Sequence, residues 1–506
     1  MFADNFSKSF GLCLNEDSNH YYNSRSGRRI SVDDLNSFID QYEGTQVKEL
    51  LLNVNCMRTS YDSAVWDPVW KGYDPEAGDD QPLFASVPEE GRKKTRAWVH
   101  AAWQLKQDGI DIYACWIDRC RKRGISPWIS MRMNDIHSVN DENNYLHSNF
   151  WKKNPDLRRV RYKFSEWTDR AFDYGRTEVR QYHFKLIEEL VERYDFDGLE
   201  LDWMRFGFHF RPGFEDQGVE ILNEFMNDVR SLLDKWEKIR GHKIKLGTRV
   251  PSRPQTALGL GMDAIAWARK GYIDMLVVTP FWASIETDIN IEIWKQLLKD
   301  TGTILAAGLE VIIRGYPQSS FIQMNSIETV RGAAASFLSR GADRIYLFNY
   351  MDCDTAMADL DNYQLLLRET GCLETLDRKS RRHVVTYSDT WVPGEARAQR
   401  LPQTVAPGSC ESFRVHIGPK PEDSAVYIVL GLKQEMPGSG KNLTVRTNGE
   451  LCGYIQTLGL KKPVPEGIAY CFSVPDGAVK EGYNYIEVIS STEACILWVE
   501  MDIRPF

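Results

Sequence analysis

The sequence predicts an α/β fold, a TIM-like (β/α)8 barrel with a C-terminal β-sandwich domain. Eight apolar runs rich in β-branched residues occur before residue 351, and segments with a helical 3.6-residue repeat lie between most of them. Strand followed by helix, repeated eight times, is typical of a barrel. Beyond about residue 375 the pattern changes to short alternating runs separated by Pro and Gly. We therefore predict a barrel domain at 1–375 and a sandwich domain at 376–506.

The predicted barrel strands are continuous apolar runs, as expected for strands buried on both faces. In chain order they are 9-SFGLCLNED, 48-KELLLNVN, 126-SPWISMR, 196-FDGLELDW, 243-KIKLGTRV, 273-IDMLVVTP, 303-TILAAGLE and 344-RIYLFNY. Clear helical periodicity spans 177–194, 219–239 and 326–340. Basic residues followed by Gly at several helix-to-strand joints indicate glycine caps at helix C-termini. The Asp-, Pro-, Gly- and Trp-rich segment 56–95 predicts a long loop at the rim where the strands end.

Six short runs predict the strands of the sandwich. They are 412-SFRVHIG, 425-AVYIVLGL, 443-LTVRTNG, 468-IAYCFSV, 483-YNYIEVIS and 495-CILWVEMDI. The basic stretch 378-RKSRRH-383 comes directly before them. We expect this stretch to be a solvated connector between the domains.

Composition restricts the class of protein. With 42% hydrophobic and 26% charged residues the chain is expected to be soluble and globular, and its net charge of −9 excludes nucleic acid and anionic membranes as partners. No apolar run is long enough to span a bilayer, and the start MFADNFSKSF lacks signal-peptide features, so we expect a cytoplasmic protein or one exported with its signal removed. Ten cysteines without a C-x-x-C pair are expected to be mostly buried free thiols, and nine scattered histidines predict no metal site and no cofactor.

Three arginines stand where predicted strands end. Arg132, Arg205 and Arg249 close the third, fourth and fifth runs, and side chains at the strand ends of a barrel converge. Converging guanidinium groups are suited to an anion. In 197-DGLELD-202 the period of two places Glu200 and Asp202 on one strand face, where they either hold the arginines as buried ion-pair partners or act in catalysis directly.

A carboxylated sugar suits this cluster better than a phosphate. The segment after the eighth strand, LFNYMDCD, offers no Gly-rich phosphate loop, whereas Trp66, Trp70 and Trp282 offer flat faces for a sugar ring. Hydrolysis of a glycoside needs a proton donor and a base or nucleophile. His137, with Asp135 beside it, is a candidate acid, and Asp17 after the first strand is a candidate base that activates water.

This set of motifs resembles glycoside hydrolase family 156, the inverting exo-sialidases, over essentially the whole chain. The resemblance implies Asp17 in LNEDSNH as general base and His137 in MRMNDIHS as general acid. It further implies four sugar-binding residues: Arg132, Arg205, Arg249, and Asn349 in LFNYMD. The implied activity is hydrolysis of terminal α-linked sialic acid from a sialylated glycan, by a homodimer and without a cofactor.

Two alternatives stay open. The stretch 197–204 also resembles the D-G-x-D-x-D-x-E motif of family 18 chitinases, but Met204 stands where the acid of that family would be. A barrel glycosidase using Glu200 and Asp202 is therefore the second hypothesis. The third is a sialoglycan-binding protein on an inactive barrel. Propeller sialidases are not matched, because their repeated Asp-containing turn occurs here only as the fragment 388-SDTW-391.

Overall fold

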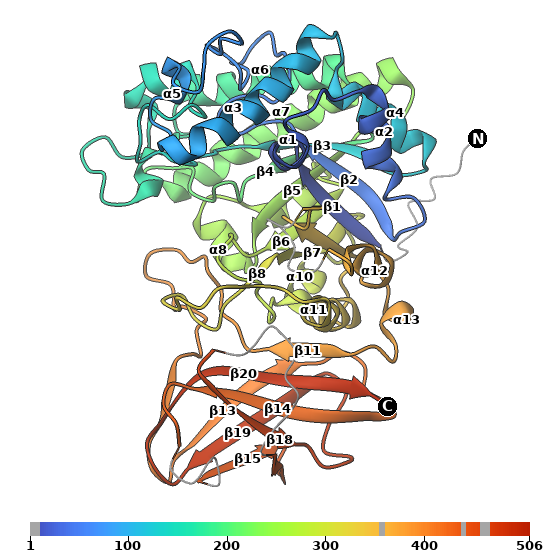
Figure 1. Cartoon of the computed structure of the whole chain (residues 1–506), viewed down its shortest axis with the longest axis vertical. Helices are drawn as coiled ribbons and strands as arrows, with labels where there is room; N and C mark the ends of the chain where they lie inside the picture. The colour runs from blue at the N-terminus through green and yellow to red at the C-terminus, as the bar shows by residue number, and fades with distance from the viewer. Residues whose placement is uncertain (1–10, 354–359, 437–441, 456–465) are drawn as a thin grey trace. The chain divides into compact units, whose positions relative to one another are not determined.

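The computed structural model describes residues 11–353, 360–436, 442–455 and 466–506. Within these residues eight parallel strands form a closed barrel in the order β1-β10-β7-β6-β5-β4-β3-β2, which confirms the predicted barrel (Figure 1). The barrel strands are β1 (Leu12–Asp17), β2 (Val47–Asn53), β3 (Ser126–Arg132), β4 (Gly198–Asp202), β5 (Lys245–Pro251), β6 (Met275–Thr279), β7 (Ile304–Glu310) and β10 (Arg344–Phe348). A two-stranded hairpin, β8 (Ile312–Ile313) with β9 (Gln323–Met324), follows β7.

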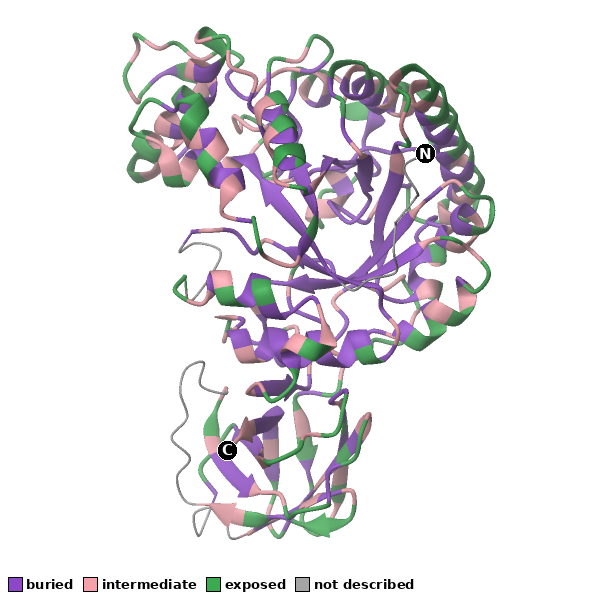
Figure 2. Cartoon of the chain, turned by 90° about the vertical axis from the view of Figure 1, so that its right-hand side faces the viewer, coloured by how far each residue is buried: buried purple, intermediate pink, exposed green. Residues whose placement is uncertain are grey.

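Helices occupy most of the connections between the strands. They are α1 (Ser18–Arg25), α2 (Val32–Asp40), α3 (Glu89–Gln107), α4 (Ile112–Lys122), α5 (Asn149–Lys153), α6 (Thr177–Arg193), α7 (Glu215–Arg240), α8 (Pro254–Gly259), α9 (Ala264–Arg269), α10 (Ile291–Leu297), α11 (Ile327–Ser339), α12 (Tyr363–Glu369) and α13 (Leu373–Leu376). The three segments with helical periodicity are confirmed as α6, α7 and α11. Gly124, Gly271 and Gly341 have φ of 71°, 70° and 103°, which confirms the glycine caps at these joints. Figure 2 shows the barrel strands buried and the outer helix faces exposed, as amphipathic helices require.

Side-chain size inside the barrel explains which strand faces point inward. Trp128 of β3 pairs in register with Gly198 of β4, and a Cβ built on Gly198 would lie 2.3 Å from the Trp128 ring. A Cβ on Gly247 of β5 would lie 2.8 Å from the same ring, so the indole fills the space that both glycines leave open. Positions two and four residues further along these strands share the inward face. Glu200 therefore lies on the inward face, where it accepts a hydrogen bond at 2.7 Å from Ser130, the next inward residue of β3.

The described residues divide into two compact units. One comprises Cys13–Val277 with Leu297–Ile304, and the other comprises Val278–Gln296, Leu305–Phe506 and the residues up to Leu12. The first unit contains β1 to β5 with their polar C-terminal residues. The second contains β10 and the antiparallel sheets that follow it. The domain boundary near residue 375 stays a prediction.

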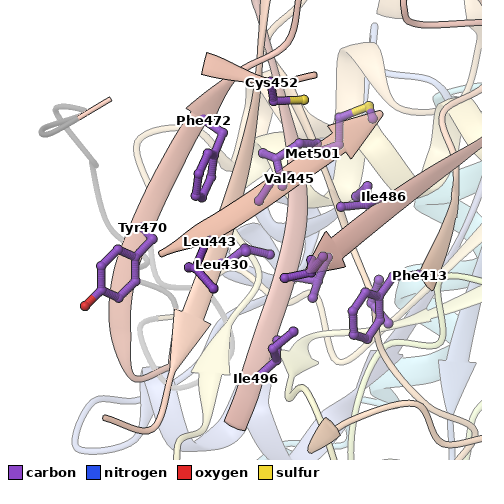
Figure 3. Packing of buried hydrophobic residues seen from close by; sticks show 14 of the residues in the cluster. Phe413, Leu430, Leu443, Val445, Cys452, Tyr470, Phe472, Ile486, Ile496 and Met501 are labelled. Atoms are coloured by element: carbon purple, nitrogen blue, oxygen red, sulfur yellow. The ribbon is translucent and has the colours of Figure 1, made fainter. Parts of the chain in front are cut away.

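Two antiparallel sheets form the C-terminal part of the chain, as predicted. Within the described residues one has the order β11-β20-β14-β18-β17 with β12 also on β20, and the other has the order β13-β19-β15-β16. Their strands are β11 (Arg381–Val384), β12 (Gln403–Val405), β13 (Cys410–His416), β14 (Ser424–Leu432), β15 (Leu443–Thr447), β16 (Glu450–Leu451), β17 (Gly453–Ile455), β18 (Ile468–Ser473), β19 (Tyr483–Ser490) and β20 (Ala494–Pro505). All six predicted segments form strands. Alternate residues of both sheets, among them Phe413, Leu430, Val445 and Ile486, make one apolar core (Figure 3).

The basic stretch 378–383 corrects one prediction. It is a solvated connector only in part, because Arg378 is exposed whereas Arg381, Arg382 and His383 are buried in β11, which pairs with β20. Arg382 donates two hydrogen bonds to Glu500 on β20, at 3.0 and 2.5 Å, and this carboxylate balances the buried charge. Burial also holds the pKa of His383 well below its usual range, which favours the neutral imidazole.

The remaining sequence predictions concern thiols, metals and membranes. All ten cysteines are free thiols, and six of them are buried: Cys13, Cys56, Cys120, Cys353, Cys452 and Cys471. Across the residues that the structure describes, no three His, Cys, Asp or Glu side chains are grouped as metal ligands would be. No described helix combines the length and the apolar character that crossing a bilayer requires.

Candidate active site

Arg132, the last residue of β3, lies between two carboxylates. Its Nη2 donates to Asp17 Oδ2 at 2.6 Å, and its Nη1 donates to Asp135 Oδ2 at 3.3 Å. Asp17 ends β1 and caps the N-terminus of α1, where its side chain accepts the backbone N–H of Asn19 at 2.9 Å. All three charged side chains are more than nine-tenths buried. The structure thus brings together, across the barrel, two residues that the sequence separates by 115 positions.

The electrostatics of this group keep its members ionised. Burial raises the pKa of Asp17, but the charge of Arg132, that of His20 and the Asn19 N–H together lower it further, so the net pKa lies below its usual value. Burial also raises the pKa of Asp135, but His137 and then Arg132 lower it by more, so the net pKa lies well below its usual range. Burial alone would lower the pKa of Arg132, but Asp17 and Asp135 raise it above its ordinary value.

His137 is fixed by Asp135. The imidazole Nδ1 lies 2.9 and 3.0 Å from the two carboxylate oxygens, and the backbone N–H of His137 donates to Asp135 Oδ1 at 3.1 Å. The His137 side chain is 42% exposed, unlike the buried Asp135. Because Nδ1 faces the carboxylate, Nε2 is the nitrogen oriented toward a ligand. A carboxylate behind an imidazole also stabilises the imidazolium, the form that can donate a proton.

Asparagines fix the backbone on which this group is built. Asn55, two residues beyond β2, accepts the Arg132 N–H at 3.0 Å and donates to the Arg132 carbonyl at 3.0 Å. Asn134 exchanges backbone hydrogen bonds with the next rim segment: its N–H donates to the Arg205 carbonyl and its carbonyl accepts from the Phe206 N–H, both at 2.9 Å. Both asparagines follow predicted strand ends, but only the structure shows that they act on backbone groups.

Arg205 and His137 are connected through an aromatic ring. The guanidinium carbon of Arg205 lies 5.2 Å from the centroid of Phe206, and the His137 ring meets the same phenyl edge to face at 5.0 Å. Trp167 packs against Phe206 at 5.1 Å from another direction. Sequence reasoning missed Phe206 and Trp167, because nothing in their local pattern distinguishes a ring beside a histidine from core packing.

The carboxylates of β4 lie deep in the barrel. Asp202 Oδ2 accepts from Arg249 Nη1 at 2.7 Å, and Arg249 is fully buried. This contact is the ion pair that one of the two sequence hypotheses expects. Glu200, also fully buried, accepts the Ser130 hydroxyl. Met204, at the position of the family 18 acid, is a buried thioether whose backbone N–H donates to Asp202 Oδ1 at 3.0 Å.

Asn349 lies in the second compact unit. It has a left-handed φ of 63°, a conformation that asparagine tolerates better than most residues, and its amide donates to Glu310 Oε1 at 2.8 Å. Glu310 is the last residue of β7, and Asn349 directly follows β10. The sugar-binding role of Asn349 stays a prediction.

The tryptophans expected to stack on a sugar divide into two groups. Trp66 and Trp70 are largely buried and line a cavity together with Tyr182. Trp66 stacks on Tyr182 at 4.4 Å, and its indole N–H donates to the Tyr182 carbonyl. Trp282 is 40% exposed. Its backbone N–H and those of Phe281 and Ala283 donate to Asp389, at 2.7 to 2.9 Å. The 388-SDTW-391 fragment therefore fixes the backbone of the loop that carries Trp282.

Comparisons with known proteins find likeness in fold. No protein-family model matches the chain, and no curated protein matches its sequence. The PgaB (BpsB) glycoside hydrolase domain from Bordetella bronchiseptica is 11% identical with a TM-score of 0.41, covering 72% of this chain and 99% of that one. A glycoside hydrolase family 18 N-acetylglucosaminidase from Paenibacillus barengoltzii is 8% identical with a TM-score of 0.38, covering 71% and 100%.

A third solved structure is longer than this chain. The cycloisomaltooligosaccharide glucanotransferase of a Paenibacillus species is 8% identical with a TM-score of 0.35, and the match covers 98% of this chain but 58% of that chain. Two of these three proteins are named glycoside hydrolases, and none is a sialidase. Similarity at this level concerns the fold and carries no argument about activity, so the chemistry must come from the site.

Proposed function

We propose that this chain is an exo-sialidase that hydrolyses terminal α-linked sialic acid from glycoconjugates by an inverting single displacement. The observation that carries the proposal is the continuous chain of contacts from Asp17 through Arg132 and Asp135 to His137. It supplies a carboxylate that stays ionised and an oriented, partly exposed imidazole within one group of linked side chains. These are the base and the acid that the resemblance to family 156 implies.

In the proposed reaction Asp17 takes a proton from water while His137 gives one to the leaving oxygen. The anomeric carbon of sialic acid carries the sugar carboxylate, so a neutral water meets less repulsion there than an anionic protein nucleophile would. The bond from that carbon to the glycosidic oxygen breaks as the bond to water forms. Attack opposite to the leaving group inverts the configuration, and the proton from His137 Nε2 neutralises the departing alkoxide.

Binding of the sugar is assigned to Arg132, Arg205, Arg249 and Asn349. Arg205 is supported by its position over Phe206, the ring that also contacts His137, because a carboxylate held by this guanidinium lies next to the proton donor. Arg249 is supported by the Asp202 contact, which fixes its orientation. Asp135, Glu200 and Asp202 are assigned supporting roles as partners of the catalytic and basic groups. The resemblance also implies a homodimer, which light scattering would test.

Proton NMR of the first product tests the proposal. During hydrolysis of an α-sialoside we expect the β-anomer of free sialic acid to appear first and the α-anomer to follow by mutarotation. Initial α-anomer would contradict inversion, and binding without release of sugar would favour the sialoglycan-binding hypothesis. His137→Ala should reduce the turnover of glycans more than that of activated aryl sialosides. His242→Ala is the matched control, since His242 also contacts an aspartate, Asp195, at 2.7 Å.

A family 18-like glycosidase is the second candidate, because both Glu200 and Asp202 point into the barrel. It predicts activity on chitin or uronide oligosaccharides that survives Arg205→Ala and is lost in Glu200→Gln. The sialidase proposal predicts the opposite pattern, with sialoside cleavage reduced by Arg205→Ala. The buried Met204 in place of the acid and the engagement of Asp202 by Arg249 favour the sialidase.

A further inference from the structure

A hairpin-like loop rises from the β3–α6 connection beside His137. Its two limbs are joined by an isolated bridge between Arg158 and Phe172 and by backbone bonds from Arg159 to Ala171 at 2.8 Å and from Val160 to Asp169 at 3.0 Å. Residues 161–168 form the tip beyond these bonds. Because its base is hydrogen-bonded on both limbs, the tip is held in place relative to the rest of its unit.

The tip carries aromatic side chains that face solvent. Tyr162 is 84% exposed and Phe164 is 56% exposed. Among the large apolar and aromatic side chains of the described residues, only Phe506 is more exposed than Tyr162. The guanidinium carbon of Arg170 lies 4.6 Å from the Phe164 centroid and covers one face of that ring. The phenyl ring is thus oriented by the protein while much of its surface stays open to a ligand.

Two independent contacts tie this loop to the proposed acid. Arg170, which orients Phe164, also donates a hydrogen bond to the carbonyl of Val139, two residues beyond His137. Trp167 of the tip packs on Phe206 at 5.1 Å, and Phe206 packs on His137 at 5.0 Å. Phe164 and Trp167 of the tip are therefore linked, by packing and by hydrogen bonding, to the segment that carries His137.

We propose that the 161–168 tip is the subsite for the leaving glycan, with Tyr162 and Phe164 stacking on the sugar ring or rings that precede sialic acid. This inference rests on the proposed function, in which His137 protonates the glycosidic oxygen. The leaving group begins at that oxygen, so its sugars extend away from His137 over the neighbouring surface. Neutral pyranoses present apolar C–H faces, which are suited to flat aromatic rings. The ligand class is a neutral oligosaccharide bearing a terminal sialic acid.

The test compares a glycan with an aryl leaving group. We would measure kcat/KM of the wild type, Tyr162→Ala, Phe164→Ala and the double variant on sialyllactose, in the linkage that the wild type cleaves faster, and on 4-methylumbelliferyl sialoside. The ratio of kcat/KM on sialyllactose to that on the aryl substrate should fall about 3- to 10-fold in the double variant, the effect of one or two aromatic stacking contacts. Phe214→Ala is the control, because Phe214 is also exposed and lies under an arginine, Arg211, at 4.0 Å.

Each outcome decides the question. An unchanged ratio, or an equal change in the Phe214→Ala control, would overturn the subsite while the sialidase activity of the wild type stands. A changed oligomeric state with equal losses on both substrates would also overturn it and assign the tip to contact between copies of the chain. No cleavage of either substrate by the wild type would refute the proposed function itself, and the subsite with it.

Discussion

Removing the Asp135 charge gives the sharpest test of the proposed acid. In Asp135→Asn the imidazole of His137 loses a carboxylate that lies 2.9 Å from Nδ1. The two carboxylate oxygens lie 2.9 and 3.0 Å from Nδ1, and one of them also accepts the His137 N–H, so an amide, with one oxygen and one NH2 group, cannot hold the ring in the same way. Because a positioned general acid contributes about 10²- to 10⁴-fold, kcat/KM on a sialyl glycan should fall at least about tenfold.

The assay is kcat/KM on a sialyl glycan and on an aryl sialoside. The glycan should show the larger loss, because its leaving group needs the proton more. Asp118→Asn removes the same charge from the exposed face of α4, where Asp118 pairs with Lys122 of the same helix, and should leave both values unchanged. An unchanged kcat/KM on the glycan in Asp135→Asn would refute the role of this dyad, and so would equal losses on both substrates.

Three further predictions concern the buried charges and packing beneath the site. Asp202→Ala removes the carboxylate that lies 2.7 Å from the fully buried Arg249, so guanidinium denaturation should show a loss of about 3–5 kcal/mol, against less than about 1 kcal/mol for Asp118→Ala; equal losses would contradict the importance of the buried contact. Gly198→Ala, whose Cβ would meet the Trp128 ring at 2.3 Å, should cost at least about 1–3 kcal/mol, whereas Gly78→Ala, with no atom within 4 Å, should be close to neutral. The pKa of Asp17 is lower in the folded chain, so its ionisation stabilises the fold above about pH 4 and this contribution is lost on acidification. Asp17→Asn should therefore flatten the fall of the unfolding free energy as the pH drops below about 4, and a slope equal to that of the wild type would contradict the pKa direction.

The barrel could be predicted from the sequence because the burial of its strands and helices determines their local pattern of apolar residues. A strand buried on both faces must be apolar throughout, and helices between such strands must show one apolar stripe, so both patterns are visible without tertiary contacts. The strand β11 was missed for the complementary reason. Its residues Arg381, Arg382 and His383 look like solvated surface in the sequence, because the carboxylate that balances the buried charge of Arg382, that of Glu500, lies 118 positions further along the chain.

The closeness of several candidate residues was predictable from the sequence, but their pairing was not. The topology of a barrel brings polar residues at strand ends to one rim, which is why Asp17, Arg132 and the segment with Asp135 and His137 lie together. Which carboxylate contacts which guanidinium depends on side-chain lengths and loop geometry. The sequence therefore left Asp202 and Glu200 as equal candidates for holding the arginines, whereas the structure pairs Arg249 with Asp202 and gives Glu200 the Ser130 hydroxyl.

In the proposed reaction, the position of Arg132 would couple binding of the substrate carboxylate to the basicity of Asp17. The charge of Arg132 is balanced by Asp17 and Asp135, so a substrate carboxylate that reaches this guanidinium must share it with them. Any lengthening of the 2.6 Å contact to Asp17 weakens the main interaction that lowers the pKa of that carboxylate. Asp17 then binds a proton more readily when the sugar is in place than when the site is empty. The substrate carboxylate would therefore make Asp17 a stronger base. A lysine cannot bridge two carboxylates in the planar way that an arginine does, so Arg132→Lys should lower kcat by a larger factor than it raises KM.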